Sequence, residues 1–375
     1  MNGKRNGKGK EYKYNKLSFE GEYYNGKKWN GKGYDLNWNI AYELKKGKGL
    51  VRQYFNTGYL FAENEYLNGE ENGKGKEYSY DNKLSFEGEY YNGKKWNGKG
   101  YDQNGNVIYE LFNGKGLVRE YEDDDLLYEY EYLNGERNGK GHSYDYFIDS
   151  QYEGEYLNNQ RSGKGKECDI FGDLLFEGEY LYNQKRKGRE YHNGKLEFEG
   201  EYLYERKWNG KGYDENGNII YKLVNGKGKV IEYEDCFVSF EGEYINGKRN
   251  GKGKEYSILG YYGVYSKEDI FSKLAFNGEY LNGKKWNGKW KEYHDDGKIR
   301  FDGEYVNGEI NGMAKEYNTA GNLEFSGEYY NGKRWNGKFN EFNFDNTIKY
   351  RGEYIDGDEY VLMRKSYFTE CLLTY

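Results

Sequence analysis

Apolar and polar residues alternate in short runs along this chain, and turn residues separate the runs. In the run Phe240–Tyr244, the two aromatic residues and the central glycine fall on one face and both glutamates fall on the other, which is the two-residue period of a β-strand. Asn246-Gly247 follows directly, and Asn-Gly between two alternating runs is a strong hairpin signal because both residues accept positive φ. A second alternating run covers Gly251–Tyr256. The pattern predicts an antiparallel β-hairpin.

The same hairpin pattern recurs from end to end, which makes the chain a repeat array. Clear copies begin at Phe19, Phe86, Tyr152, Phe176, Phe198 and Phe240, variants at Phe61, Tyr128, Phe276, Phe301, Phe325 and Tyr350, and weaker copies at Tyr42, Tyr109 and Tyr221. A lone hairpin is marginal in water, so each copy must be stabilised by its neighbours. We therefore predict an all-β, continuous array of about 15 hairpins over residues 1–360, with residues 361–375 as a C-terminal cap or tail.

Composition alone would indicate disorder, and the repeat changes that interpretation. Only 35% of the 375 residues are apolar, whereas the chain contains 55 Gly, 47 Tyr and no Pro. Glycine normally weakens a strand, so its regular place inside the first strand, as at Gly21 and Gly242, indicates that an aromatic ring lies close over the backbone. The rings would then replace aliphatic side chains as the core.

Charge limits the classes of partner. The net charge of −7 comes from 57 basic and 64 acidic residues that are mixed along the chain. Glutamates in the first strand and lysines in the second can pair across each hairpin. No basic stripe of the kind that selects nucleic acid is present, so we expect no nucleic-acid partner.

At this point the residues resemble the MORN (membrane occupation and recognition nexus) repeat family, whose unit of about 23 residues reads roughly Tyr-Glu-Gly-x-Trp/Tyr-x-x-Gly-x-x-x-Gly-x-Gly. The match is close at Phe19–Tyr23, Asn25-Gly26 and Gly31–Gly33, and comparable matches cover nearly the whole chain. The resemblance implies an elongated, single-layer, twisted antiparallel sheet of stacked hairpins with an aromatic-lined groove. It also implies a role in scaffolding, protein binding or membrane-adjacent assembly. The chain uses Tyr where many members have Trp, and it carries no appended kinase or methyltransferase domain, so those activities are not carried over.

Five copies insert one extra residue after the turn, and each time it is a tryptophan. These residues are Trp29, Trp96, Trp208, Trp286 and Trp335. They either cover their own hairpin end and pack the groove, or form a ridge that anchors a partner, as tryptophan commonly does at binding hot spots. Three of these copies are followed by a short copy of 19 residues, so a larger unit of about 67 residues is duplicated inside the array.

One insertion is a further candidate for interaction. The copy that begins at Phe240 carries an insertion at 257–275, which would place Tyr261, Tyr262 and Tyr265 in a projecting loop or a longer hairpin. Such insertions either bind partners or are neutral decoration.

The two ends of the array also differ from the middle. The segment Asn2–Tyr12 is only half a repeat, so its strand would leave an open sheet edge. The tail concentrates aliphatic residues and either caps the last repeat or forms a dimer contact. Its self-association candidates are Leu362, Phe368, Leu372 and Leu373.

We find no motif that indicates catalysis, a metal or a cofactor. The fragment Gly26–Gly33 satisfies GxxxxGK, but a phosphate-binding loop needs Ser or Thr next and a following helix. His142, His192 and His294 lie in different repeats at no common ligand spacing, and the three cysteines lie far apart. Glutamate pairs recur in almost every unit, whereas an active site needs one unusual environment.

We therefore expect a non-catalytic repeat scaffold, not an enzyme, that binds a protein partner or another copy of itself, end to end. The alternative is a membrane-surface or phospholipid adaptor, although every lysine run is interleaved with glutamate, which weakens attraction to anionic lipid. No small-molecule substrate is expected. The start of the chain lacks a secretory signal, and the expected location is intracellular and cytoplasmic, either free or peripheral to a membrane or the cytoskeleton.

Overall fold

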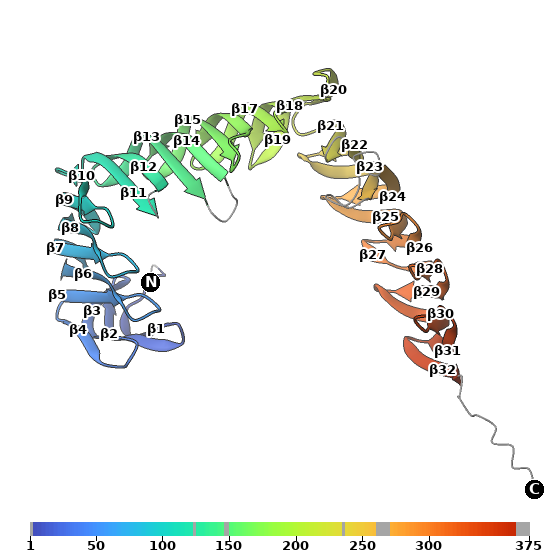
Figure 1. Ribbon diagram of the computed structural model, residues 1–375, viewed down its shortest axis with the longest axis horizontal. Coiled ribbons are helices and arrows are strands. Elements are labelled where there is room, and N and C mark those ends of the chain that lie inside the picture. Colours follow the sequence, from blue (N-terminus) through green and yellow to red (C-terminus); the bar gives the residue numbers. More distant parts are fainter. Residues whose placement is uncertain (1–2, 123–124, 146–149, 235–236, 260–270, 365–375) are drawn as a thin grey trace, which may run out of the picture. The chain divides into compact units, whose positions relative to one another are not determined.

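The computed structural model describes residues 3–122, 125–145, 150–234, 237–259 and 271–364. These residues form an all-β structure of 32 strands and no helix, which confirms the predicted fold class (Figure 1). No membrane-crossing helix is therefore found in the described part of the chain. The chain divides into two compact units, Met1–Arg186 and Lys187–Tyr375, and the division falls within strand β17.

The strands follow one another in chain order, and short turns join them wherever the connecting residues are described. The first two sheets contain β1 (Gly7–Lys13), β2 (Lys16–Tyr24), β3 (Lys27–Tyr34), β4 (Ile40–Leu44), β5 (Gly49–Tyr54), β6 (Leu60–Leu67), β7 (Glu70–Tyr78), β8 (Leu84–Tyr91), β9 (Lys94–Tyr101) and β10 (Val107–Leu111). The third contains β11 (Gly116–Glu122), β12 (Asp125–Leu133), β13 (Glu136–Asp145), β14 (Ser150–Leu157), β15 (Gln160–Asp169), β16 (Leu174–Leu181), β17 (Gln184–His192), β18 (Lys195–Leu203), β19 (Arg206–Tyr213) and β20 (Ile219–Leu223). The fourth contains β21 (Gly228–Glu234), β22 (Phe237–Ile245), β23 (Lys248–Leu259), β24 (Phe271–Leu281), β25 (Lys284–Tyr293), β26 (Ile299–Val306), β27 (Glu309–Ile310), β28 (Gly312–Tyr317), β29 (Leu323–Tyr330), β30 (Lys333–Phe342), β31 (Ile348–Ile355) and β32 (Asp358–Arg364).

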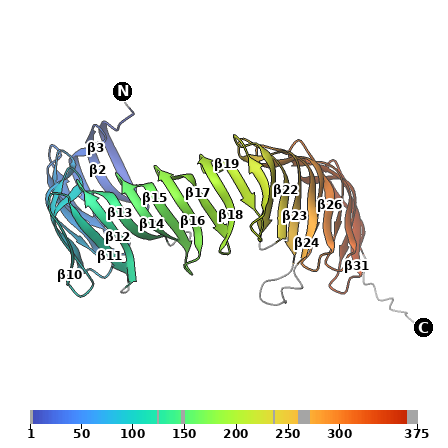
Figure 2. The ribbon, with the colours of Figure 1, turned by 90° about the horizontal axis from the view of Figure 1, so that it is seen from above.

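Within each sheet the strands pair antiparallel and in chain order, except that β26 pairs with both β27 and β28. Strands β11 to β16 lie side by side in Figure 2. The continuous sheet of the prediction is divided into four, and each break falls in one of the three short copies. In each short copy the first strand has only five residues. Between this strand and the next one, the only backbone pairing is an isolated β-bridge beside the turn. These bridges are Lys45 to Lys48, Phe112 to Lys115 and Val224 to Lys227.

Hairpin β22–β23 shows how the sequence pattern becomes structure. Its turn residues Asn246 and Gly247 have φ of 55° and 68°, as expected for Asn-Gly in a hairpin. Glu241 lies opposite Lys254 in the register, and the lysine Nζ is 2.8 Å from the Glu241 carboxylate. The predicted cross-strand charge pairing is confirmed at this position.

The core is a row of buried aromatic rings on one face of the strands. The leading phenylalanines of the clear copies, such as Phe198 and Phe240, are fully buried. A Cβ added to Gly242 would lie 2.5 Å from Cζ of Phe240 and 2.7 Å from Cα of Gly253 on the paired strand. The prediction that strand glycines make room for aromatic rings is therefore confirmed here.

Candidate interaction surfaces

The five inserted tryptophans occupy one structural position, the unpaired residue of a β-bulge. In hairpin β2–β3, Glu22 pairs with Asn30 and Tyr23 pairs with Lys28, which leaves Trp29 without a cross-strand partner. The other four hairpins have the same register. Their bulge residues are Trp96, Trp208, Trp286 and Trp335.

Each of these tryptophans connects its own hairpin to the turn of the next one. The carbonyl oxygen of Trp29 accepts a hydrogen bond of 2.6 Å from the N–H of Gly47, and a Cβ on Gly47 would lie 2.8 Å from Cζ3 of the indole ring. Equivalent backbone bonds run from Gly114 to Trp96, Gly226 to Trp208, Gly308 to Trp286 and Gly357 to Trp335. All five side chains are half-buried. These contacts support the structural interpretation of the tryptophans, although part of each ring still faces solvent.

The residue just before the hairpin turn is apolar and exposed in nearly every copy, a feature that the sequence analysis missed. We call these side chains the apolar row. In the first unit the row consists of Tyr24, Leu67, Tyr91, Phe112, Leu133, Leu157 and Leu181. In the second unit it consists of Val224, Ile245, Leu281, Val306, Tyr330 and Ile355. The sequence does carry a signal for this row. Ten of its members are followed directly by Asn-Gly and one, Ile355, by Asp-Gly, so the recurring pattern is an apolar residue just before the turn dipeptide.

Turns along the apolar row donate backbone hydrogen bonds to the neighbouring hairpin. In two places both turns carry a member of the row: Gly135 donates to the Gly114 carbonyl oxygen at 2.8 Å, and Gly247 donates to that of Gly226 at 2.9 Å. Three members of the row also contact a bulge tryptophan, with ring centroids 5.2 Å apart. These pairs are Tyr24–Trp29, Tyr91–Trp96 and Tyr330–Trp335. Exposed apolar groups are thus held on an ordered backbone at regular intervals within each unit.

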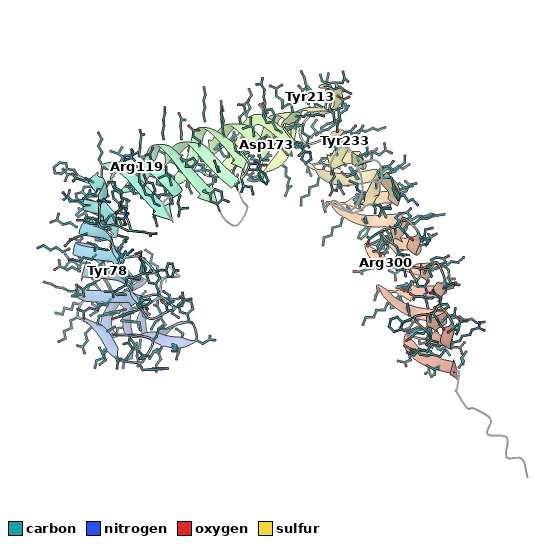
Figure 3. The ribbon with its side chains drawn as sticks, viewed as in Figure 1. Tyr78, Arg119, Asp173, Tyr213, Tyr233 and Arg300 are labelled. Atoms are coloured by element: carbon teal, nitrogen blue, oxygen red, sulfur yellow. The ribbon has the colours of Figure 1, made fainter. Side chains whose placement is uncertain are left out.

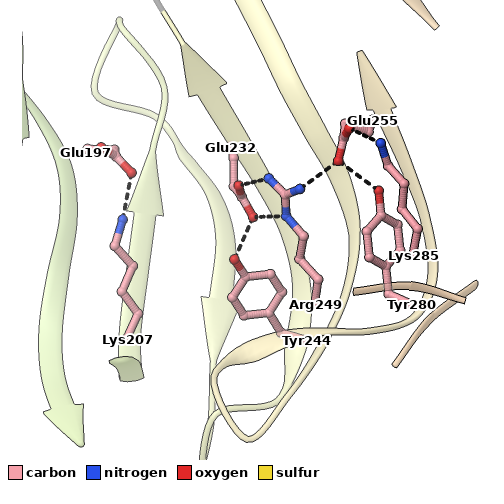
Figure 4. A network of polar contacts seen from close by, with 8 residues as sticks. All are labelled: Glu197, Lys207, Glu232, Tyr244, Arg249, Glu255, Tyr280 and Lys285. Carbon is pink, nitrogen blue, oxygen red and sulfur yellow. Dashed lines mark hydrogen bonds and ion pairs between the residues drawn. The ribbon is translucent and has the colours of Figure 1, made fainter. Parts of the chain in front are cut away.

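Side chains extend from both faces of the strands (Figure 3), and the aromatic face carries a second charged system. Arg249 lies over Phe240, with its Cζ 4.2 Å from the ring centroid, and pairs with Glu232 at 2.5 Å and Glu255 at 2.9 Å (Figure 4). Tyr244 donates a hydrogen bond of 2.5 Å to Glu232. The rings expected to line an open groove are therefore covered in this hairpin, because a cation and two carboxylates lie on top of them.

The same covering recurs in both units. Lys28 lies over Phe19 and pairs with Glu11 at 2.8 Å, while Arg334 lies over Phe325 and pairs with Glu316 at 2.6 Å. Burial opposes ionisation of Glu316, but hydrogen bonds from Arg334 and Tyr329 hold its pKa below the usual range. Strand alternation predicts charge only on the exposed face, whereas in the structure a basic residue also lies directly opposite the second aromatic residue of the first strand.

Hairpin β6–β7 departs from this scheme. Ala62 stands where other copies have an aromatic ring, Asn64 replaces the strand glycine, and Glu71 takes the place of the covering cation. The Asn64 side chain is buried and donates to Glu71 at 3.2 Å, and the Tyr66 hydroxyl donates to the same carboxylate at 3.2 Å. Burial raises the pKa of Glu71.

The remaining sequence candidates divide between described and undescribed residues. Leu362 is exposed in β32, and β1 is an edge strand of the first sheet, as the half-repeat predicted. The insertion begins as a longer hairpin, in which Leu259 pairs with Phe271. The other candidates, Tyr261, Tyr262, Tyr265, Phe368, Leu372 and Leu373, lie outside the described residues. Among the residues that the structure describes, no group of three or more His, Cys, Asp or Glu could hold a metal ion.

Comparison with known proteins gives only distant likenesses. No family model and no curated protein sequence matches the chain. A chain of the Photorhabdus luminescens Tc holotoxin pore is similar at 9% identity and a TM-score of 0.17, over 89% of this chain and 17% of that one. A protein from Lactobacillus plantarum is similar at 9% identity and a TM-score of 0.13, over 78% of this chain and 91% of that one. This chain thus spans only a small part of the toxin chain, and likenesses at these TM-scores carry no argument.

Proposed function

We propose that the chain is a non-catalytic, MORN-type repeat scaffold that binds a protein partner along the apolar row. The observation that carries this proposal is the exposure of an apolar side chain before nearly every hairpin turn, from 39% for Leu181 to 75% for Phe112 in the first unit. Scattered exposed apolar residues are normal on a protein surface, but a continuous apolar patch is typical of an interaction site.

The geometry of the row suits an extended partner. Bonded turns fix the spacing of the side chains before binding, so little conformational freedom would be lost when a partner docks. Three tyrosines of the row, each against a bulge tryptophan, add large ring surfaces of the kind that commonly contributes most to binding. The interleaved Glu and Lys of the strands would keep the free protein soluble and align the partner.

The proposal is tested by removing apolar surface from the row without touching the core. In the double variant Leu133→Ser/Leu157→Ser, two exposed row members become polar. The matched control is Leu117→Ser/Leu126→Ser, since these leucines are similarly exposed in the same unit but lie outside the row. Immobilised full chain is used to capture proteins from the native source, with circular dichroism to confirm folding.

We expect the control to retain a specifically captured protein and the row variant to lose it. Equal capture by both variants would refute the row as the binding surface. Light scattering coupled to size exclusion identifies a second copy as the occupant if the row variant alone becomes monomeric. Flotation with acidic liposomes tests the lipid alternative, which fails if the protein stays in solution at low salt.

A further inference from the structure

The first unit contains a groove of about 880 Å³ that is separate from the apolar row. Residues of β1 to β6 line it, together with Arg5 before β1 and residues of the turns after β2, β3 and β6. A volume of this size falls within the range of sites that enclose most of a drug-sized ligand, about 300–1,000 Å³. The groove is therefore large enough to hold a short stretch of peptide.

The charge of the groove lining is opposite to that of the whole chain. Seven of its side chains are cationic and two, Glu11 and Asp35, are acidic. Both acidic groups are already engaged. Glu11 pairs with Arg5 and Lys28 at 2.8 Å each, and Asp35 Oδ1 accepts the backbone N–H groups of two residues in its own turn.

Five of the cations form ion pairs with carboxylates, whereas Lys13 and Lys16 have no carboxylate within ion-pair distance among the described residues. Lys16 is still close enough to Asp35 to help lower the pKa of that carboxyl, after the hydrogen bonds that Asp35 accepts in its turn. These two lysines lie opposite each other where β1 and β2 meet at their turn. Like charges directly opposite on paired strands are unfavourable, and a bound anion would relieve the repulsion. Lys16 Nζ donates to the Leu36 carbonyl oxygen at 2.8 Å, and Lys13 lies against the Tyr14 ring.

One wall of the groove is a strand edge. Lys10, Glu11, Tyr12 and Lys13 belong to β1, and among the described residues β1 pairs with β2 alone. An edge strand offers backbone groups to an added strand, and a peptide can use them whereas a nucleic acid or an inorganic anion cannot.

The lining also includes apolar groups. Leu44 and Val51 contribute to it beside Tyr42, and all three belong to one buried cluster. The buried Tyr23 hydroxyl is also in the lining, where burial and the neighbouring Glu11 carboxylate raise its pKa to about 12. A ligand with both apolar and acidic side chains would match this combination.

We propose that the groove binds an extended acidic peptide. Its main chain adds to the open edge of β1, its carboxylates approach Lys13 and Lys16, and its apolar side chains contact the Leu44 and Val51 side of the groove. This second binding site does not depend on the apolar row, so either proposal can fail while the other stands.

The test is fluorescence anisotropy with the full chain and a short fluorescein-labelled peptide of glutamate and leucine. We expect saturable binding that Lys13→Glu/Lys16→Glu weakens about tenfold or more, since opposed charges at an interface are replaced by like charges. The matched control is Lys8→Glu, an exposed lysine of the same strand outside the groove lining. It should leave the affinity nearly unchanged.

Two altered probes test the mode of binding. A peptide with N-methyl groups on alternate residues cannot pair fully with a strand edge, and a peptide with lysine in place of glutamate has the wrong charge. Both should bind at least about tenfold more weakly. Undiminished binding by the Lys13/Lys16 variant, by the N-methylated peptide or by the basic peptide would overturn the proposal. So would tighter binding of a single-stranded oligouridylate, which would indicate nucleic acid as the ligand.

Discussion

Replacing Gly88 with alanine should destabilise hairpin β8–β9, because this glycine lies where three groups converge. A Cβ there would lie 2.1 Å from the Asn97 carbonyl oxygen, 2.7 Å from Cα of Gly98 and 2.8 Å from Cζ of Phe86. Two of these groups are backbone of the paired strand, and Phe86 is fully buried, so none can rotate away without loss of pairing or packing.

The size of the effect follows from two opposing terms. Overpacking a filled core typically costs about 1–3 kcal/mol, and a clash with backbone falls at the upper end of that range. Alanine also restricts the unfolded chain, which offsets the cost by about 0.4–1 kcal/mol. We therefore expect a net loss of about 2 kcal/mol in the free energy of opening this hairpin.

Hydrogen exchange followed by mass spectrometry is the suitable assay, since a repeat array can open locally without global unfolding. A loss of about 2 kcal/mol corresponds to about 30-fold less protection in β8 and β9, with distant hairpins unchanged.

The control is Gly93→Asn in the same hairpin, where φ is +78° and no atom lies within 4 Å of an added Cβ. Asparagine tolerates that conformation, so protection should change little. Unchanged exchange in Gly88→Ala would refute the close packing of ring and glycine.

Three further predictions follow from the covering network and the bulges. Arg249→Met should lower the free energy of unfolding in urea by about 1–3 kcal/mol, because two partly buried carboxylates lose a shared cation. Lys254→Met, at a more exposed ion pair, should have a much smaller effect, and equal losses would contradict the role of the covering cation. Burial, with a contribution from Glu197, raises the pKa of Tyr221 to about 12 from its usual value near 10, so the stability it contributes is complete below pH 10 and is lost as pH rises toward 12. The difference in tyrosine absorbance between the natural chain and Tyr221→Phe should titrate in this window together with loss of the circular-dichroism signal, and a difference that titrates at about pH 10 in the folded protein would contradict this. Trp96→Ala should lower the free energy of unfolding in urea by about 2 kcal/mol, because the Trp96 ring packs on Gly114 and Tyr91. An unchanged free energy of unfolding would show that the ring is purely a surface group.

Much of the fold could be predicted because the repeat enforces local rules many times. Alternation in runs such as Phe240–Tyr244 sets the strand faces, and Asn246-Gly247 fixes the turn by its positive φ. The open edge at β1 also follows from a missing half-repeat. The breaks between sheets were not predicted, because the number of bridges that a five-residue strand such as β4 can form depends on its twist and its neighbours.

The interaction surfaces were harder to predict because they depend on register. The inserted Trp29 was noticed as an extra residue, but only the pairing shows that it is a bulge packed on the next turn. Likewise, whether Arg249 covers a ring or faces solvent depends on its lying opposite Tyr244. The apolar row combines residues about 24 positions apart, so it becomes a surface only when the turns stack.

The central claim is that the apolar row contacts a partner, and site-specific photo-crosslinking tests it most directly. A photoreactive phenylalanine analogue is placed at Leu157 in the row and, in a separate protein, at Leu117 outside it. After capture from the native source and illumination, we predict a discrete crosslinked species from position 157 and none from position 117. Crosslinking from Leu117 alone, or from neither position while the partner is still captured, would contradict the claim.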